Sequence, residues 1–502
     1  MNERQSAANL VEAVRGKGVH LWSDSGRLRY RAPKGALTHD ERERLAAASP
    51  EILALLADVP GDWHTSVHEP GRAHGRRAPL AFSQLAHWQL YALRERSTIR
   101  HIAGAWRLRG ALNCAALERS IAEVVRRHEA LRTRIAVIDG APMQEVMEGK
   151  IASLVLEDLS DVPEGERETA VQRRIESLIH EPVLLSRGPL FEARLLKVHE
   201  REHVLLAVME HAIADMASVE VFRSEVLHAY EQVLRHRPIC LPAASLQFTD
   251  YAESQWAHHR QWLETHGRYW AERLNGSERV RFPTDGEASH RAEAGWGMVP
   301  VRIGRDLKQK LRAWCRAQRT TLVMTLFTAY VASVMRWCAT SDVVVQYAID
   351  GRVDARAERA IGFLASLLYL RVQARETDNF VDLLRAVTRE YCQAFEHADA
   401  YYLATQVPRP EFTRTCMFNF VPYRGEAARP QFMPPQASIT CEPIPCSHLM
   451  LKSLELDYEP MLVLFEAEDE IAGAVHFARR SFSAEAMERF TRLFLGVLED
   501  VS

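Results

Sequence analysis

The sequence has few cysteines, and none of them forms a recognisable pattern. Its 502 residues include eight cysteines, with no CxxC pair and no cluster spaced like metal ligands. This scatter argues against a disulfide framework and a structural metal site, and it is typical of a reducing compartment. We therefore read the cysteines as small buried hydrophobic residues and expect no bound metal.

Charge of one sign and long apolar runs are lacking too. The formal net charge of -3 argues against bulk affinity for nucleic acid or an acidic membrane. Residues 1–6 carry an acid and no apolar core, unlike a signal peptide. The longest apolar stretch, 322–335, is interrupted by Thr325, Thr328 and Ser333, so it indicates a buried helix and not a membrane span. We expect a cytoplasmic, monomeric protein with no nucleic-acid or membrane partner.

The first 58 residues form a small α-β-β-α unit. A short apolar-faced helix is expected over 7–14, and strands over 19–22 and 27–31 flank a turn-forming tetrapeptide. Thr38 and Glu41 have the spacing of a capping box at the start of a second helix. Residues 59–78, rich in Pro, Gly, His and Arg, predict a linker between this unit and the rest of the chain.

The second strand of this unit carries a row of basic residues. Alternation places Arg27, Arg29 and Arg31 on one face, and Lys34 follows. One interpretation is an ordinary solvated basic face, and the other is a sheet edge that captures an extended acidic peptide. The helix–hairpin–helix order with LRYRAPKGALT (28–38) resembles the tubulysin-type β-hairpin docking domains of assembly-line enzymes. That resemblance implies binding of an acidic linear motif at the C-terminus of an upstream carrier subunit, and it favours docking.

One histidine follows a strand-like apolar run. Residues 204–209 are apolar, His211 comes two positions later, and Asp215 precedes a helical pattern. This order predicts an imidazole at the end of a sheet with an acid behind it, as suits a general base in a cleft. HxxxD alone is weak evidence, because the chain has 21 histidines and the same spacing occurs at His20 and Asp24. A lone histidine beside an apolar strand is more often structural.

The surrounding motifs resemble those of nonribosomal peptide synthetase condensation domains. RHEALRT (127–133) matches the family's RHExLRT closely, and PLAFSQ (79–84), GPLFEARL (188–195), GR (351–352) and IGF (361–363) resemble other family segments. The family's HHxxxDG element is altered here, with Glu210 in place of the first His and Met216 in place of Gly. The resemblance implies an α/β fold of two chloramphenicol-acetyltransferase-like lobes in a V around a tunnel, an N-lobe over 79–262 and a C-lobe over 263–502.

The resemblance also assigns roles to individual residues. His211 is the expected catalytic residue. The family's aspartate is mainly structural and pairs with an arginine on the neighbouring strand, so Asp215 is expected to pair with Arg194. Glu210 is either a second catalytic carboxylate or a structural replacement for the family's histidine, and we favour the structural role.

Two further residues are expected near the donor channel. Met216 adds bulk where the family keeps glycine beside the donor arm. Ser218 is expected to cap the next helix, with contact to a bound arm as the alternative.

The implied reaction is acyl transfer from a carrier-protein phosphopantetheine thioester to an amine or hydroxyl acceptor, with no bound cofactor. A covalent acyl-enzyme is not indicated, because no serine or cysteine lies in a GxSxG-type elbow. No adenylation, carrier or thioesterase module follows the second lobe, so we expect a stand-alone enzyme similar to chain-releasing condensation enzymes of polyketide assembly lines. Three alternatives stay open: a carrier-bound epimerase, a coenzyme A-dependent HxxxD acyltransferase, and a non-catalytic docking scaffold, which Glu210 and Met216 suggest.

Overall fold

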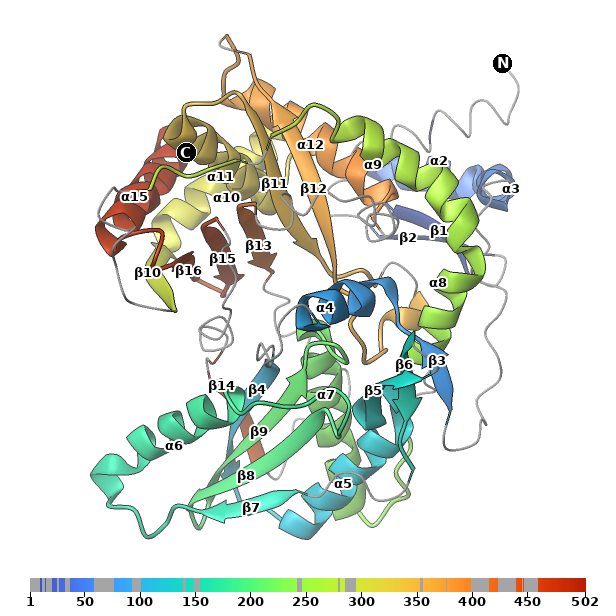
Figure 1. Ribbon diagram of the computed structural model, residues 1–502, viewed down its shortest axis with the longest axis vertical. Helices are drawn as coiled ribbons and strands as arrows, with labels where there is room; N and C mark the ends of the chain where they lie inside the picture. Colours follow the sequence, from blue (N-terminus) through green and yellow to red (C-terminus); the bar gives the residue numbers. More distant parts are fainter. Residues whose placement is uncertain are drawn as a thin grey trace.

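The structure, a computed structural model, describes most of the chain outside the first fifth. The described residues are 10, 14, 20–24, 27–31, 37–57, 76–92, 101–138, 141–148, 154–241, 246–278, 280–284, 295–352, 355–375, 377–398, 415–422, 439–444, 446 and 459–502. Within them the protein has a small N-terminal unit followed by two larger lobes, drawn one above the other in Figure 1.

The N-terminal unit has the predicted order of elements. Strands β1 (His20–Asp24) and β2 (Arg27–Arg31) form an antiparallel hairpin, and α2 (His39–Ala47) and α3 (Ser49–Ala57) follow. The Thr38–Glu41 capping box is confirmed, because each side chain accepts a hydrogen bond from the other residue's backbone N–H. Of the first predicted helix only residues 10 and 14 are described, and both are helical.

The predicted basic face is only partly covered by the described residues. The hairpin register alternates Arg27, Arg29 and Arg31 with Leu28 and Tyr30, which puts the three arginines on one face of β2. Their side chains, and the whole of Lys34, lie outside the described residues. The docking role of these four residues therefore stays a prediction.

The N-lobe is built on a five-stranded sheet in the order β14-β4-β9-β8-β7 and a small sheet in the order β3-β6-β5. Its strands are β3 (Arg77–Pro79), β4 (His101–Gly110), β5 (Thr133–Ile138), β6 (Ala141–Val146), β7 (Val155–Asp158), β8 (Phe191–His199), β9 (Glu202–Glu210) and β14 (Ile439–Ile444). Its helices are α4 (Phe82–Ala92), α5 (Cys114–Arg127), the short η1 (Glu129–Arg132), α6 (Glu164–Ile179), α7 (Met216–Leu234) and α8 (Phe248–Trp262). The apolar run that ends at His211 becomes β9. Strand β9 pairs with β4 along one edge and with β8 along the other, and it is buried along nearly its whole length.

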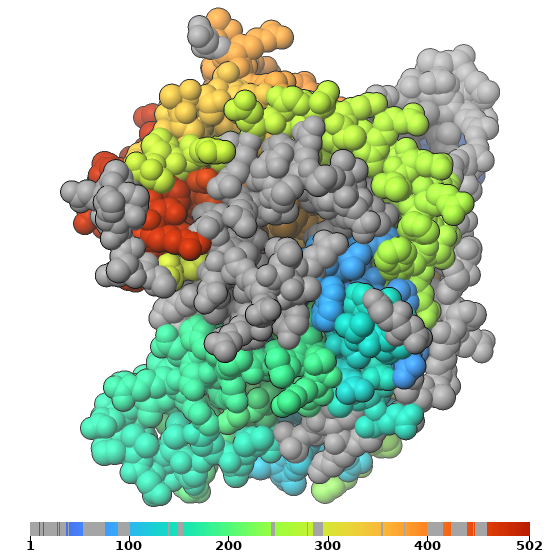
Figure 2. Space-filling view, in the orientation of Figure 1, coloured from blue at the N-terminus to red at the C-terminus, as the bar shows by residue number. Residues whose placement is uncertain are grey.

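The C-lobe has a six-stranded sheet in the order β10-β16-β15-β13-β11-β12. Its strands are β10 (Trp296–Ile303), β11 (Asp342–Ile349), β12 (Ser366–Gln373), β13 (Met417–Val421), β15 (Met461–Glu466) and β16 (Ile471–Ala478). Its helices are η2 (Leu263–Gly267), α9 (Arg268–Arg273), α10 (Arg305–Gln318), α11 (Leu322–Cys338), the short η4 (Ala355–Ala357), α12 (Phe380–Glu396) and α15 (Ala484–Val501). The apolar stretch 322–335 lies in α11, and its residues 324–335 are all buried. In Figure 2 this lobe is orange, red and yellow above the green and cyan N-lobe.

Some segments from the second half of the chain belong to the N-lobe, which the predicted boundary between the lobes at 262/263 does not anticipate. Strand β14 comes from the second half of the chain but pairs with β4 of the N-lobe, and Ile361 and Leu364 join the N-lobe core. Helices α8, η2 and α9 follow one another without a gap across the 262/263 boundary. At the other end, Arg77 and Ala78 belong to β3, so the N-lobe begins before the predicted end of the linker. The two lobes and the mixed α/β architecture are present, and the tunnel between them stays a prediction.

Within the described part of the chain, no single helix has the length and apolarity to cross a membrane. Helices α10 and α11 satisfy that test only as a pair, and they are bent by 101° relative to each other.

Candidate active site

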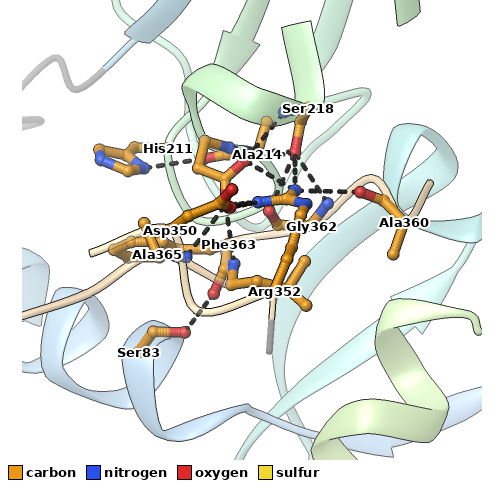
Figure 3. A network of polar contacts seen from close by, with 12 residues as sticks. Ser83, His211, Ala214, Ser218, Asp350, Arg352, Ala360, Gly362, Phe363 and Ala365 are labelled. Atoms are coloured by element: carbon orange, nitrogen blue, oxygen red, sulfur yellow. Dashed lines mark hydrogen bonds and ion pairs between the residues drawn. The ribbon is translucent and has the colours of Figure 1, made fainter. Parts of the chain in front are cut away.

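His211 follows the last residue of β9, and a hydrogen bond to the next turn fixes its ring. The Nδ1 atom lies 2.8 Å from the carbonyl oxygen of Ala214. A carbonyl oxygen can only accept, so Nδ1 carries the hydrogen and the neutral ring has its basic nitrogen at Nε2. The Phe363 ring lies 4.2 Å from the imidazole, with the two planes inclined by 40°. Figure 3 shows His211 at the margin of a polar network that has Arg352 at its centre.

Asp215 starts helix α7 and anchors this network. Its side chain accepts from the backbone N–H of Ser218, 2.9 Å away, and from the Ser218 hydroxyl at 2.7 Å. The Arg352 guanidinium donates to both Asp215 oxygens, at 2.8 Å each. The backbone N–H groups of Leu364 and Ala365 donate to the same carboxylate, at 3.1 and 3.0 Å. These contacts connect the loop after His211 to the start of α7 and to residues 352, 364 and 365, as expected of a structural aspartate.

The electrostatics of this pair keep both groups charged. Burial on its own would raise the pKa of Asp215, but the Arg352 charge and the hydrogen bonds outweigh it, so the pKa lies below its usual value. Burial likewise works against the charge of Arg352, but the two carboxylates of Asp215 and Asp350 outweigh it and raise the pKa. The side chains of Asp215 and Arg352 are only 3% and 4% exposed. Removing one partner of such a buried pair costs about 3–5 kcal/mol.

The predicted partner of Asp215 was wrong. Arg194 lies opposite Leu206 in the β8–β9 register, four residues before the end of β9 at Glu210, which corresponds to about 13 Å along the strand. Its side chain instead pairs with Glu192 on its own strand, 2.5 Å away. Arg352 comes from the other half of the chain, 137 residues beyond Asp215. The GR pair at 351–352 was the available sequence signal, but no local pattern links it to Asp215.

The glycine before Arg352 is required by the backbone. Gly351 has a φ of +70°, and a Cβ placed there would come within 1.9 Å of the Leu364 carbonyl oxygen. An L-residue is strained in that conformation and has no room in this one. Gly351 thus lets the segment after β11 (Asp342–Ile349) turn closely enough for Arg352 to reach Asp215.

Glu210 is buried directly before His211. Its Oε1 lies 2.8 Å from Nε2 of His87 on helix α4, and its Oε2 accepts from the backbone N–H of Ala212. Burial would raise the pKa of Glu210, but the His87 imidazole and the Ala212 N–H outweigh it, so the pKa is lowered and the group is ionised. These contacts are of the packing and hydrogen-bonding kind favoured from the sequence. Sequence reasoning missed His87, which lies just after the PLAFSQ segment.

Met216 and Ser218 have different surroundings. Met216, the first residue of α7, is 39% exposed, and its expected place in a donor channel stays a prediction. Ser218 is fully buried, and its hydroxyl contacts Asp215, Arg352 and the Gly362 carbonyl. Ser218 takes part in capping α7, but not as the N-cap: Asp215 holds that position, and the Ser218 hydroxyl accepts from the Asp215 backbone N–H, 3.3 Å away, to complete a capping box. The Ser218 hydroxyl is engaged inside the protein, and the alternative of contact with a bound arm stays a prediction.

No cluster of three or more His, Cys, Asp or Glu side chains that could hold a metal ion occurs among the described residues.

Comparison with models of known protein families identifies both parts of the chain. Residues 75–502 match the model of the condensation domain family. The chain belongs to the condensation domain family. Residues 8–58 match the TubC N-terminal docking domain, which confirms the resemblance of the N-terminal unit. Both resemblances expected from the sequence are therefore confirmed at the level of family.

Curated relatives are large synthetases. One component of the linear gramicidin synthase of Brevibacillus parabrevis is 30% identical over 364 residues, which are 71% of this chain and 7% of that protein. A second component of the same synthase is 31% identical over 365 residues, 72% of this chain and 5% of that protein. The chain thus spans less than a tenth of the length of either relative.

Solved structures share the fold. The X-domain in its complex with OxyB from teicoplanin biosynthesis has a TM-score of 0.70 at 22% identity, covering 87% of this chain and 96% of that one. A condensation domain described as mediating chain release from the enacyloxin polyketide synthase has a TM-score of 0.65 at 22% identity. That alignment covers 100% of this chain and 97% of the other. At this identity the likeness shows the condensation-domain fold of chloramphenicol-acetyltransferase-like lobes.

Proposed function

We propose that the protein is a condensation enzyme that transfers an acyl chain from a carrier-protein phosphopantetheine thioester to an amine or hydroxyl acceptor. The observation that carries the proposal is the tautomer of His211 within a condensation-domain fold. Its Nδ1–H is bound to the Ala214 carbonyl 2.8 Å away. Nε2 is therefore the nitrogen that can receive a proton. The ring is only partly buried, as a group that meets substrate requires.

The reaction requires the protein to orient the two reactants and to supply one proton acceptor. The acceptor nitrogen or oxygen attacks the thioester carbonyl carbon, a C–N or C–O bond forms, and the C–S bond breaks. His211 Nε2 takes the proton that the acceptor loses and returns it to the departing phosphopantetheine sulfur. Because a thioester is already activated, holding the two reactants together supplies much of the rate. Amines are more nucleophilic than alcohols, so transfer to an alcohol depends more on His211.

The N-terminal unit supports delivery of the donor by an upstream carrier subunit. Its row of arginines on β2 fits an acidic linear motif that adds to the hairpin edge. The enacyloxin structure, whose described role is chain release, aligns over the entire length of this chain. We therefore propose chain release as the step, with a carrier protein as the donor partner and a free or tethered small molecule as the acceptor.

Intact-protein mass spectrometry of an acyl-loaded carrier tests the proposal. The carrier is incubated with and without this protein and a panel of free amines and alcohols. Loss of the acyl group with appearance of a matching amide or ester is expected, and His211→Ala is expected to suppress it. Unchanged loading of the carrier with every acceptor would refute the proposal.

The same assay separates the three alternatives. An epimerase would place solvent deuterium in the acyl group of a loaded carrier without any acceptor. An acyltransferase that uses coenzyme A would accept a coenzyme A thioester as donor and would not need residues 1–58. A scaffold would bind the carrier and leave its acyl group in place.

A further inference from the structure

Helix α4 (Phe82–Ala92) is hydrogen-bonded to the residues immediately before and after His211. The Gln84 amide donates to the Ala212 carbonyl at 2.8 Å, and His87 binds the Glu210 carboxylate at 2.8 Å. His87 and Gln84 are three residues apart, so they lie on the same face of the helix. The residues on both sides of His211 are therefore held by one rigid element.

The same helix reaches the segment that packs on the imidazole. The Ser83 hydroxyl donates to the carbonyl of Phe363 at 2.6 Å, and the Phe363 ring packs against His211 in a tilted arrangement. The ring of His87 lies 6.2 Å from that of His211 and 6.3 Å from that of Phe363. Helix α4 thus contacts both the backbone that carries His211 and the residue whose aromatic ring packs beside its imidazole.

The His87–Glu210 contact is a charge-assisted hydrogen bond in a dry site. The two side chains are 4% and 5% exposed. Since Glu210 is ionised and can only accept, the hydrogen lies on Nε2 of His87. The second carboxylate oxygen accepts from the Ala212 N–H, so the pair ties α4 to residues 210–212. Nδ1 of His87 is buried and makes no hydrogen bond within the described part of the chain.

We propose that His87 is a positioning residue for His211, acting through Glu210; this deepens the proposed function and rests on it. The chain carries a carboxylate where the condensation-domain motif has its first histidine. A buried carboxylate is tolerated only if it is paired. His87 supplies the imidazole from α4 instead, so the altered motif is a rearranged support for His211 and not a sign of a lost active site.

The chain offers a matched control for this pair. His128 Nε2 also lies 2.8 Å from a carboxylate, Oε2 of Glu225, and the side chains are 2% and 3% exposed. Glu225 is ten residues beyond Asp215, the N-cap of α7, which is about 15 Å along that helix. The two pairs have the same His–carboxylate distance and similar burial. They differ in that Glu225 also forms an ion pair with Arg127, 3.1 Å away, and in that only the His87 pair adjoins His211.

The test compares His87→Phe with His128→Phe in the full chain, using an acyl-loaded carrier and an alcohol acceptor. His87→Phe keeps a ring and loses the donor, and we expect kcat to fall about 10- to 100-fold while KM for the carrier stays within about twofold. His87→Gln, which keeps an N–H near the Nε2 position, is expected to restore most of kcat. His128→Phe is expected to lower the stability and to leave kcat per folded molecule within about twofold.

A second background separates positioning from loss of structure. If His87 acts through His211, then His87→Phe has no further effect on the residual rate of the His211→Ala enzyme. A fall that persists in that background, or an equal fall in His128→Phe, would overturn the proposal.

A crystal structure of His87→Phe gives a readout that does not depend on turnover. The proposal expects the contact between His211 Nδ1 and the Ala214 carbonyl to be broken or displaced, and retention of that contact would refute it. If the proposed function itself is wrong, the unaltered protein transfers no acyl group. That result differs from failure of the His87 proposal, in which the unaltered protein is active.

Discussion

Replacing Arg352 tests how the site is held together. Its guanidinium donates to Asp215, to Asp350 at 2.7 Å, to Ser218 at 3.1 Å and to the Ala360 carbonyl at 3.0 Å. Arg352→Met removes all of these bonds and leaves the carboxylate of Asp215 buried without its counter-ion. The loss of a buried partner predicts a fall of about 3–5 kcal/mol in the free energy of unfolding. In urea, with a slope of about 3 kcal/mol/M, the midpoint falls by about 1 M or more.

Arg194→Met is the matched control, because Arg194 is the arginine that the sequence had favoured. Its side chain is 18% exposed, and its partners are carboxylates that are themselves 29% to 57% exposed. Such ion pairs contribute about 0–1 kcal/mol, so this variant is expected to unfold within about 0.3 M of the unaltered protein.

A compensating variant distinguishes the buried charge from lost packing. Asp215→Asn added to Arg352→Met removes the unpaired charge, so the double variant is expected to be less destabilised than the sum of the single variants. Urea unfolding followed by circular dichroism measures the unaltered protein, the three single variants Arg352→Met, Arg194→Met and Asp215→Asn, and the double variant. Equal losses for Arg352→Met and Arg194→Met, or a larger loss for the latter, would refute the assignment of Arg352 as the partner of Asp215.

Three further predictions concern catalysis, pH and docking. His211→Ala is expected to lower kcat for an alcohol acceptor more than for an amine, by about tenfold or more, and mass-spectrometric rates with both acceptors on one loaded carrier check this. The pKa of Asp215 is lower in the folded than in the unfolded protein, so its ionisation stabilises the fold above about pH 4 and ceases to do so as the pH falls through the folded-state pKa. The stability difference between the unaltered protein and Asp215→Asn is therefore expected to shrink in acid, as urea midpoints from pH 7 down to pH 3 would show; a constant difference contradicts the pairing. Arg29→Glu is expected to raise KM about tenfold for a carrier with an acidic C-terminal motif and to leave kcat unchanged, and a carrier without that motif is the control. Equal KM values for the unaltered protein and Arg29→Glu would exclude Arg29 from docking.

Much of the candidate site could be placed from the sequence because its features are local. The strand before His211, the helix after Asp215, the docking hairpin and the Thr38–Glu41 capping box all lie within short windows of residues. Hydrophobic periodicity and capping chemistry determine such windows directly. The family resemblance then related these pieces to a known two-lobed fold.

The contacts that hold His211 in place were decided by the tertiary structure alone. Asp215 could have paired with any arginine that reached it, and the one that does, Arg352, is brought there by Gly351 and a segment of the C-lobe. Glu210 looked like a departure from the motif until α4 placed His87 against it, 123 residues away in the sequence. A buried charge selects its partner by three-dimensional proximity and exclusion of water. The sequence therefore determined which residues carry charge and where strands end, and only the packing of the two lobes decided which charges meet.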